Sequence, residues 1–130
     1  MATAPVLGSI GDKIDLLIKQ GSTYGPMVAT IKNPDLTPVN LTSCLIRGQI
    51  RKKALDVAVV ADFVVAITDE PGGVFEFSLT DEVTALITCD EIKERPGSKY
   101  VWDMELEDAL GRVTPLYYGD VTVFREVTHP

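Results

Sequence analysis

The chain has 130 residues, the usual size of a single domain. Hydrophobic residues make up 45% of the sequence, which excludes an intrinsically disordered chain. The formal net charge of −7 argues against binding to nucleic acid or to an anionic membrane surface, because both attract basic proteins.

The sequence lacks signals for membrane insertion or export. No apolar run approaches the roughly 18 residues that a membrane-spanning helix needs, and the N-terminus has neither the basic start nor the apolar core of a secretory signal. We therefore expect a soluble protein made in a cytoplasm, with Cys44 and Cys89 unbridged. Residues 1–11 show no hydropathy pattern, so we expect an N-terminal arm followed by one domain over residues 12–130.

The first half of the domain consists of short segments in which apolar and polar residues alternate. Residues 13–19 and 27–32 show this period of two, which predicts two strands. Residues 33–38 contain two prolines and form a predicted loop. A third strand is predicted over residues 44–53, and residues 54–60 fit either a loop or an irregular strand.

Two further strands are predicted over residues 62–68 and 74–79. They flank residues 69–73, whose sequence DEPGG is the strongest turn signal in the chain. The residues predicted to point inward from the middle strands are Ile46, Ile50, Phe63, Val65, Ile67, Phe75, Phe77 and Leu79.

One short helix is predicted within residues 81–88. Thr80 is a suitable N-cap, and two acidic residues follow it in the first turn. The predicted apolar stripe consists of Val83, Leu86 and Ile87. Residues 91–97 break the pattern and end the helix.

The last part of the domain, residues 99–127, is a predicted hairpin that turns at residues 108–111. Its first strand points the following residues inward: Tyr100, Trp102, Met104 and Leu106. The apolar phase of the second strand slips near Gly119, where we predict a β-bulge. The hairpin contains the only tryptophan, so we place it at the centre of the core. Seven or eight short strands with one small helix predict an all-β sandwich or small barrel.

Two rows of charged residues are the candidate contact sites. The acidic row consists of Asp103, Glu105 and Glu107. It fits either a hard-cation site or a solvated strand face. The basic row consists of Arg47, Arg51 and Lys53. It fits a solvated strand face, an acidic or phosphate-bearing partner, or the acidic face of another copy of the chain.

Residues for catalysis are not evident in the sequence. The only histidine, His129, lies next to the C-terminus, where its imidazole is poorly held. Cys44 and Cys89 have no histidine nearby in sequence to activate them, so we predict that they are core residues. We therefore expect no enzyme, no metal site and no cofactor. An aromatic set fits either the core or a ligand pocket, and consists of Tyr100, Trp102, Tyr117, Tyr118 and Phe124.

Several short segments occur together in a familiar order. They are QGST at residues 20–23, PVNLT at 38–42, IRKK at 50–53, LTDEVTAL at 79–86, YVWDMEL at 100–106, GDVTV at 119–123 and EVT at 126–128. This order resembles small virion proteins of tailed phages and prophages, in particular the immunoglobulin-like N-terminal domain of phage upper baseplate proteins. The resemblance covers nearly the whole chain from Lys13 onward, and residues 91–96 look like a small insertion. It implies an immunoglobulin-like antiparallel β-sandwich of about seven to eight strands.

The resemblance also implies a function, and it carries over no catalytic residues. It implies a structural part of the virion, in the tail, the baseplate or the attachment of fibres. Other virion proteins and copies of the chain itself are the expected partners, and a homo-oligomer in a particle assembled in the host cytoplasm is the expected state. Two alternatives stay open, which are a capsid decoration protein and a carbohydrate- or ligand-binding sandwich with Trp102 or Tyr118 exposed in a pocket.

Overall fold

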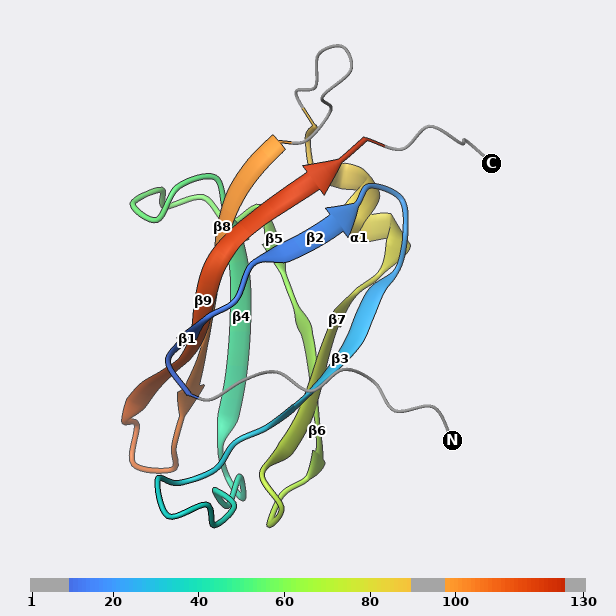
Figure 1. Ribbon diagram of the computed structural model, residues 1–130. Coiled ribbons are helices and arrows are strands. Elements are labelled where there is room, and N and C mark those ends of the chain that lie inside the picture. The colour runs from blue at the N-terminus through green and yellow to red at the C-terminus, as the bar shows by residue number, and fades with distance from the viewer. Residues whose placement is uncertain (1–9, 90–97, 126–130) are drawn as a thin grey trace.

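The computed structural model describes residues 10–89 and 98–125, which form two β-sheets and one short helix (Figure 1). The elements are β1 (Asp12–Lys13), β2 (Leu16–Lys19), β3 (Tyr24–Thr30), β4 (Leu45–Arg51), β5 (Ala61–Asp62), β6 (Val64–Asp69), β7 (Val74–Leu79), α1 (Asp81–Leu86), β8 (Ser98–Glu107) and β9 (Val113–Phe124). The larger sheet has the order β1-β9-β8-β4-β5, with β2 also paired to β9, and the smaller sheet has the order β3-β7-β6.

The two sheets form an immunoglobulin-like sandwich. Strands β4, β8 and β9 share one sheet while β3, β6 and β7 share the other, which is how immunoglobulin-like domains divide their strands. The pairs are antiparallel except at one edge, where β1 and β2 run parallel to β9. The predicted sandwich of seven to eight strands with one helix is therefore confirmed. The described residues contain nine strands because two predicted strands are each divided in two.

The core lies between the sheets and centres on an aromatic cluster. Phe63 and Phe77 meet edge to face with ring centroids 5.3 Å apart, and each ring lies 5.8 Å from the ring of Trp102. Trp102 is only 2% exposed, which confirms its predicted place in the core. Strand β7 alternates as predicted, since Phe75, Phe77 and Leu79 are all buried.

The first divided strand is residues 13–19, and the interruption between β1 and β2 is caused by a contact with the core. The indole Nε1 of Trp102 donates a hydrogen bond of 2.7 Å to the carbonyl oxygen of Ile14. A Cβ atom at Gly119 would lie 1.9 Å from the same oxygen. Only glycine therefore allows the chain to approach β9 this closely.

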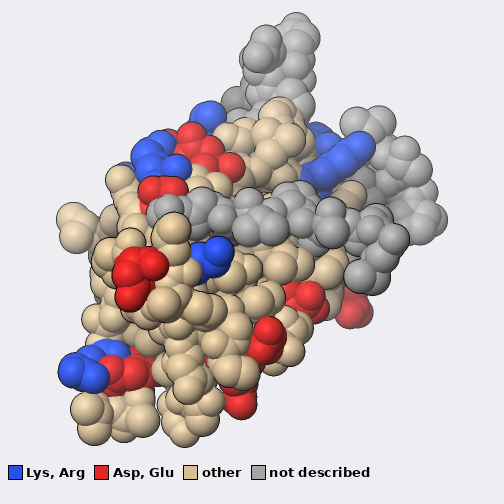
Figure 2. Space-filling view, turned by 60° about the horizontal axis from the view of Figure 1, so that its bottom comes forward, with Lys and Arg blue, Asp and Glu red and all other residues tan. Residues whose placement is uncertain are grey.

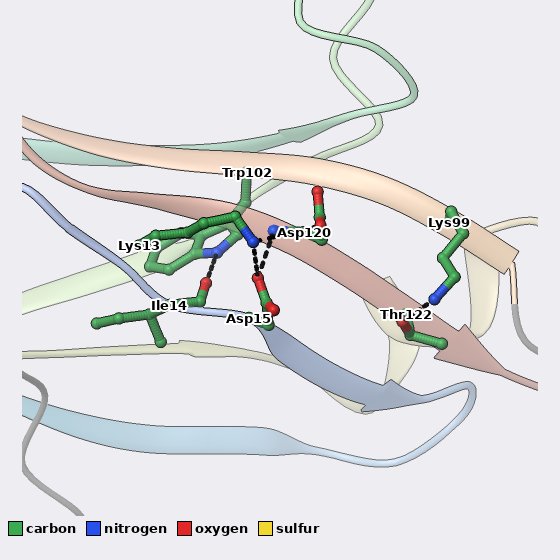
Figure 3. A network of polar contacts seen from close by, with 7 residues as sticks. All are labelled: Lys13, Ile14, Asp15, Lys99, Trp102, Asp120 and Thr122. Atoms are coloured by element: carbon green, nitrogen blue, oxygen red, sulfur yellow. Dashed lines mark hydrogen bonds and ion pairs between the residues drawn. The ribbon is translucent and has the colours of Figure 1, made fainter.

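Polar contacts fix the segment between β1 and β2 (Figure 3). The Asp15 carboxylate accepts hydrogen bonds from the backbone N–H of Asp120, at 3.1 Å, and from the ammonium of Lys13, at 2.9 Å. Further along β8 and β9, the ammonium of Lys99 donates to the hydroxyl of Thr122. The edge strands are thus bound to the hairpin by side chains as well as by the backbone ladder.

The predicted bulge at Gly119 is wrong in position. Gly119 pairs in register with Trp102, and the register instead shifts at Leu116, which has no counterpart on β8. Leu116 and Tyr117 are consecutive in sequence and both buried, which is the signature of the extra residue. Gly119 is required by the close approach of Ile14 and not by a bulge.

The second divided strand is residues 62–68. Its first part, β5, pairs with β4 in the larger sheet, whereas β6 pairs with β7 in the smaller sheet. Phe63 stands between the two parts, buried, with its backbone N–H donating to the carbonyl of Gly48. The alternation continues through this residue, so the sequence pattern does not reveal that the chain changes sheets.

Helix α1 begins as predicted, because the hydroxyl of Thr80 accepts a hydrogen bond from the backbone N–H of Val83. The predicted apolar stripe is only partly right. Leu86 is 83% exposed, and Ile87 is buried but lies just beyond the helix. The buried residue within the helix is Thr84.

Other predictions concern residues outside the described ranges. Residues 1–9 of the predicted arm, the insertion at residues 91–96 and His129 are among them. The last residue of the predicted arm, Gly11, is described, and its backbone N–H donates to the carbonyl of Leu116 on β9.

Candidate interaction surface

The acidic row and the basic row meet on the outer face of the larger sheet. Arg47 on β4 faces Glu105 on β8 in the antiparallel register. Its guanidinium lies 2.8 Å from the carboxylate of Glu105 and 3.0 Å from that of Glu107. All three side chains are more than a third exposed, so solvent screens these ion pairs and they contribute little to stability. Within one chain, Arg47 of the basic row thus pairs with two members of the acidic row.

Arg51, at the end of β4, holds the loop that follows it. Its Nη1 donates to the backbone carbonyls of Asp56 and Val57, at 2.7 and 2.6 Å, and its Nη2 donates to the side chain of Gln49. Lys53, the third member of the basic row, lies beyond the strand and is exposed. The three members of the basic row therefore have different roles: Arg47 forms ion pairs, Arg51 binds the backbone of the following loop, and Lys53 faces solvent.

Asp103 differs from the other members of the acidic row. Its carboxylate has no hydrogen-bond or ion-pair partner among the described residues. Burial raises the pKa of this carboxyl and the neighbouring charge of Glu105 raises it further, while Arg51 opposes the shift.

Asp103 lies between two depressions on the outer face. The larger, about 310 Å³, is a groove whose lining includes Arg51, Ala54, Val101, Tyr118 and Asp120. The smaller, about 200 Å³, lies over Arg47, Gln49, Arg51 and Glu105. The groove is continuous at Ala54 with the loop that Arg51 holds. We refer to it below as the outer groove.

The aromatic set divides between core and surface. Tyr100, Trp102 and Tyr117 are buried, and Phe124 is partly buried. Tyr118 alone is half exposed and lines the outer groove. Of the two alternatives for this set, the core therefore holds for its three buried members.

The loop at residues 54–60 was not predicted to be a contact site, although it is the most apolar exposed segment among the described residues. Its sequence is ALDVAVV, and all but Asp56 are exposed. Leu55 is 95% exposed and Val57 is 91% exposed. An interstrand loop without Gly, Pro, Asn or Ser was the signal in the sequence, because such loops usually need turn residues. Figure 1 shows this loop projecting from the upper end of β4.

A second group of exposed apolar side chains lies at the opposite end of β4. Leu45 is the first residue of β4. It pairs with Glu107 on β8, and Glu107 pairs in turn with Val113 on β9, so the three residues lie side by side across the sheet. Leu45 is 56% exposed and Val113 is 48% exposed. Leu110, 77% exposed, lies in the adjacent turn, which is held by three hydrogen bonds to the carboxylate of Asp108. Figure 2 brings this end forward and shows small groups of both charges separated by uncharged surface.

These two apolar ends are separated by the length of the strand between them. β4 has seven residues, so its ends lie about 20 Å apart at the usual rise of a strand. The two groups, residues 54–60 at one end and Leu45, Leu110 and Val113 at the other, are therefore distinct surfaces.

Several other features of the described residues bear on function. Within them, no cluster of three or more His, Cys, Asp or Glu side chains has the arrangement of a metal site. None of the described helices is long and apolar enough to span a membrane. Cys44 and Cys89 are not joined by a disulfide, and burial raises the pKa of the Cys44 thiol.

The fold and surface define an immunoglobulin-like β-sandwich with two exposed apolar ends. Comparison of the sequence with protein-family models and with curated proteins found no match.

Proposed function

We propose that this chain is a non-enzymatic structural protein of a tailed-phage virion, which connects neighbouring proteins in the tail, the baseplate or the attachment of fibres. The order of the sequence segments described above supports the phage assignment. The observation that carries the connector role is the pair of apolar ends on one rigid sandwich. Leu55 and Leu110, one at each end, are both more than three-quarters exposed.

A connector needs at least two contact surfaces that are held at a fixed separation. The framework between the ends is β4, which is paired on both sides, by β5 and β8. Apolar side chains presented on rigid elements lose little conformational entropy on binding, which favours association. Many such contacts in a particle add through effective concentration even when each is weak.

Of the two alternatives, capsid decoration uses the same surfaces at another position in the particle. Carbohydrate or ligand binding is less well supported, because Trp102 is buried and Tyr118 is the one aromatic residue of the set exposed in the outer groove. A sugar platform would therefore depend on that tyrosine.

Mass spectrometry of purified tailed-phage particles whose genome carries this gene would test the proposal. We expect the chain in purified particles and, after the heads and tails are separated, in the tail fraction. A few copies to a few dozen per particle fit a tail component, whereas on the order of hundreds fit capsid decoration. Absence of the chain from the particles would overturn the virion assignment.

Substitutions test the connector role. We expect Leu110→Asp to reduce incorporation into particles at least tenfold, because a carboxylate would have to be desolvated in the contact. The matched control is Leu17→Asp, since Leu17 is 66% exposed but lies on β2, away from both apolar ends. Equal incorporation of both variants would contradict the role of this end.

A further inference from the structure

The loop at residues 54–60 is shaped as a fixed protrusion. Arg51 binds two of its backbone carbonyls, the N–H of Asp56 donates to the carbonyl of Lys53, and the N–H of Val60 donates to that of Ile50. The loop thus presents Leu55 and Val57 to solvent in a defined conformation. Their exposure has no role in the fold of a single chain.

The outer groove lies beside this loop on the same face of the molecule. Ala54 belongs to both, and Arg51 lines the groove while its guanidinium holds the loop. Val101 and Tyr118 give the groove apolar surface. A protrusion and a recess that adjoin each other on one face are the elements of a self-complementary contact, because a two-fold axis between them brings each over its counterpart.

The charges beside these two features are also complementary. Lys53 stands at the base of the loop and has no ion-pair partner among the described residues. Asp103, at the edge of the groove, also has none among them. Rotation about the same axis would bring the lysine of one copy toward the aspartate of the other, and the contact would shield both charges from solvent, which strengthens their attraction.

We propose that two copies of this chain pair through the outer faces of their larger sheets, with Leu55 and Val57 of each copy seated in the outer groove of the other. Lys53 of one copy faces Asp103 of its counterpart. This inference names one partner of the proposed connector and rests on that function for its setting. The other apolar end, at Leu45, Leu110 and Val113, stays available for a different protein.

Analytical ultracentrifugation of the purified full chain tests the pairing. We expect a monomer–dimer equilibrium between roughly 1 and 200 µM, a range typical of weak specific contacts. The double variant Leu55→Asp, Val57→Asp should raise the dissociation constant at least tenfold. Leu86→Asp is the matched control, because Leu86 is 83% exposed but lies on α1. A wild-type chain that remains monomeric at 200 µM, or equal weakening by the control, overturns the proposal.

Two further measurements test the pairing even if the double variant folds poorly. Lys53→Glu and Asp103→Lys should each weaken the dimer, and their combination should restore it. In a mixture of Leu55→Cys chains with Tyr118→Cys chains, oxidation should join one of each, while the wild-type chain under the same conditions should remain unjoined. Failure of both the charge restoration and the mixed disulfide overturns the proposed geometry. Virion incorporation, measured separately, decides the connector function.

Discussion

The two faces of β8 are made from alternate residues of one strand, yet they have different tasks. The inner residues Trp102 and Met104 are buried against the smaller sheet, where aromatic contacts hold the sandwich together. The outer residues Asp103 and Glu105 lie at the surface depressions, among charges that solvent screens. Residues that stabilise the fold therefore alternate along β8 with residues that are available for association. Substitutions on the outer face should change stability little, and substitutions on the inner face should change association little.

The largest loss of stability is expected from a substitution where the inner face of the larger sheet meets its edge strands. Gly119→Ala places a Cβ atom 1.9 Å from the carbonyl oxygen of Ile14, and the backbone must shift. We expect a loss of about 3 kcal/mol in the free energy of unfolding, measured by urea denaturation. The control Gly111→Ala has open space around its Cβ and should cost about 1 kcal/mol, because only its positive φ of 81° is unfavourable. Equal losses would show that the contact with Ile14 is not restrictive.

Trp102→Phe tests the same contact from the core. The substitution keeps a ring against Phe63 and Phe77 but removes the donor to Ile14 and leaves a small cavity. We expect a loss of about 2 kcal/mol by urea denaturation. Because Trp102 and Gly119 both act on Ile14, the double variant should lose less than the sum of the single variants. Strict additivity would contradict the coupling.

Tyr117 gives the inner face a pH dependence. Burial, with the nearby charge of Asp12, raises the pKa of its phenol to about 12, so the folded state retains the proton that the unfolded state loses near pH 10. Stability therefore falls as the pH rises from 10 to 12. At pH 11 the loss relative to neutral pH is about 1.4 kcal/mol from this group. Tyr117→Phe should remove that part of the alkaline loss in denaturation series at pH 9 and 11. Tyr118→Phe, on the outer face, is the control, and an unchanged alkaline loss in Tyr117→Phe would contradict the assignment.

The alternation of residues was enough to predict the inner face, because period two is a local property of a strand. It placed Trp102 and Phe77 correctly and gave the bounds of β7. It misassigned Gly119, because the Ile14 oxygen that requires a glycine there comes from a segment more than a hundred residues earlier. Such contacts depend on the parallel pairing of β2 with β9, which no local pattern encodes.

The candidate site could be predicted only in part, for the same reason. The acidic row lies on one face of β8 as predicted, and Arg47 and Arg51 lie on one face of β4, whereas Lys53 lies beyond that strand. Their mutual pairing through Arg47 and Glu105 follows from the adjacency of β4 and β8, which strand periodicity does not give. Residues 54–60 form a loop, which was one of the two predictions for them, but their use as a contact surface was not predicted. That surface depends on Arg51, which fixes the loop backbone from the outer face, and a pattern of apolar residues does not reveal this contact.

The smallest change in stability is expected from substitutions on the outer face. Two adjacent residues on β4, one pointing inward and one outward, provide the sharpest comparison of the two faces. Ile46 points inward and is buried, whereas Arg47 points outward to two carboxylates. Ile46→Val deletes one methylene from the core and should cost about 1 kcal/mol. Arg47→Met removes a whole charge and two ion pairs, yet it should change the urea midpoint less than Ile46→Val does, because the ion pairs are screened. It should also reduce the dependence of stability on salt. If Arg47→Met proved the more damaging, the outer face would itself hold the sheet together, and the separation between the two faces of the larger sheet would fail.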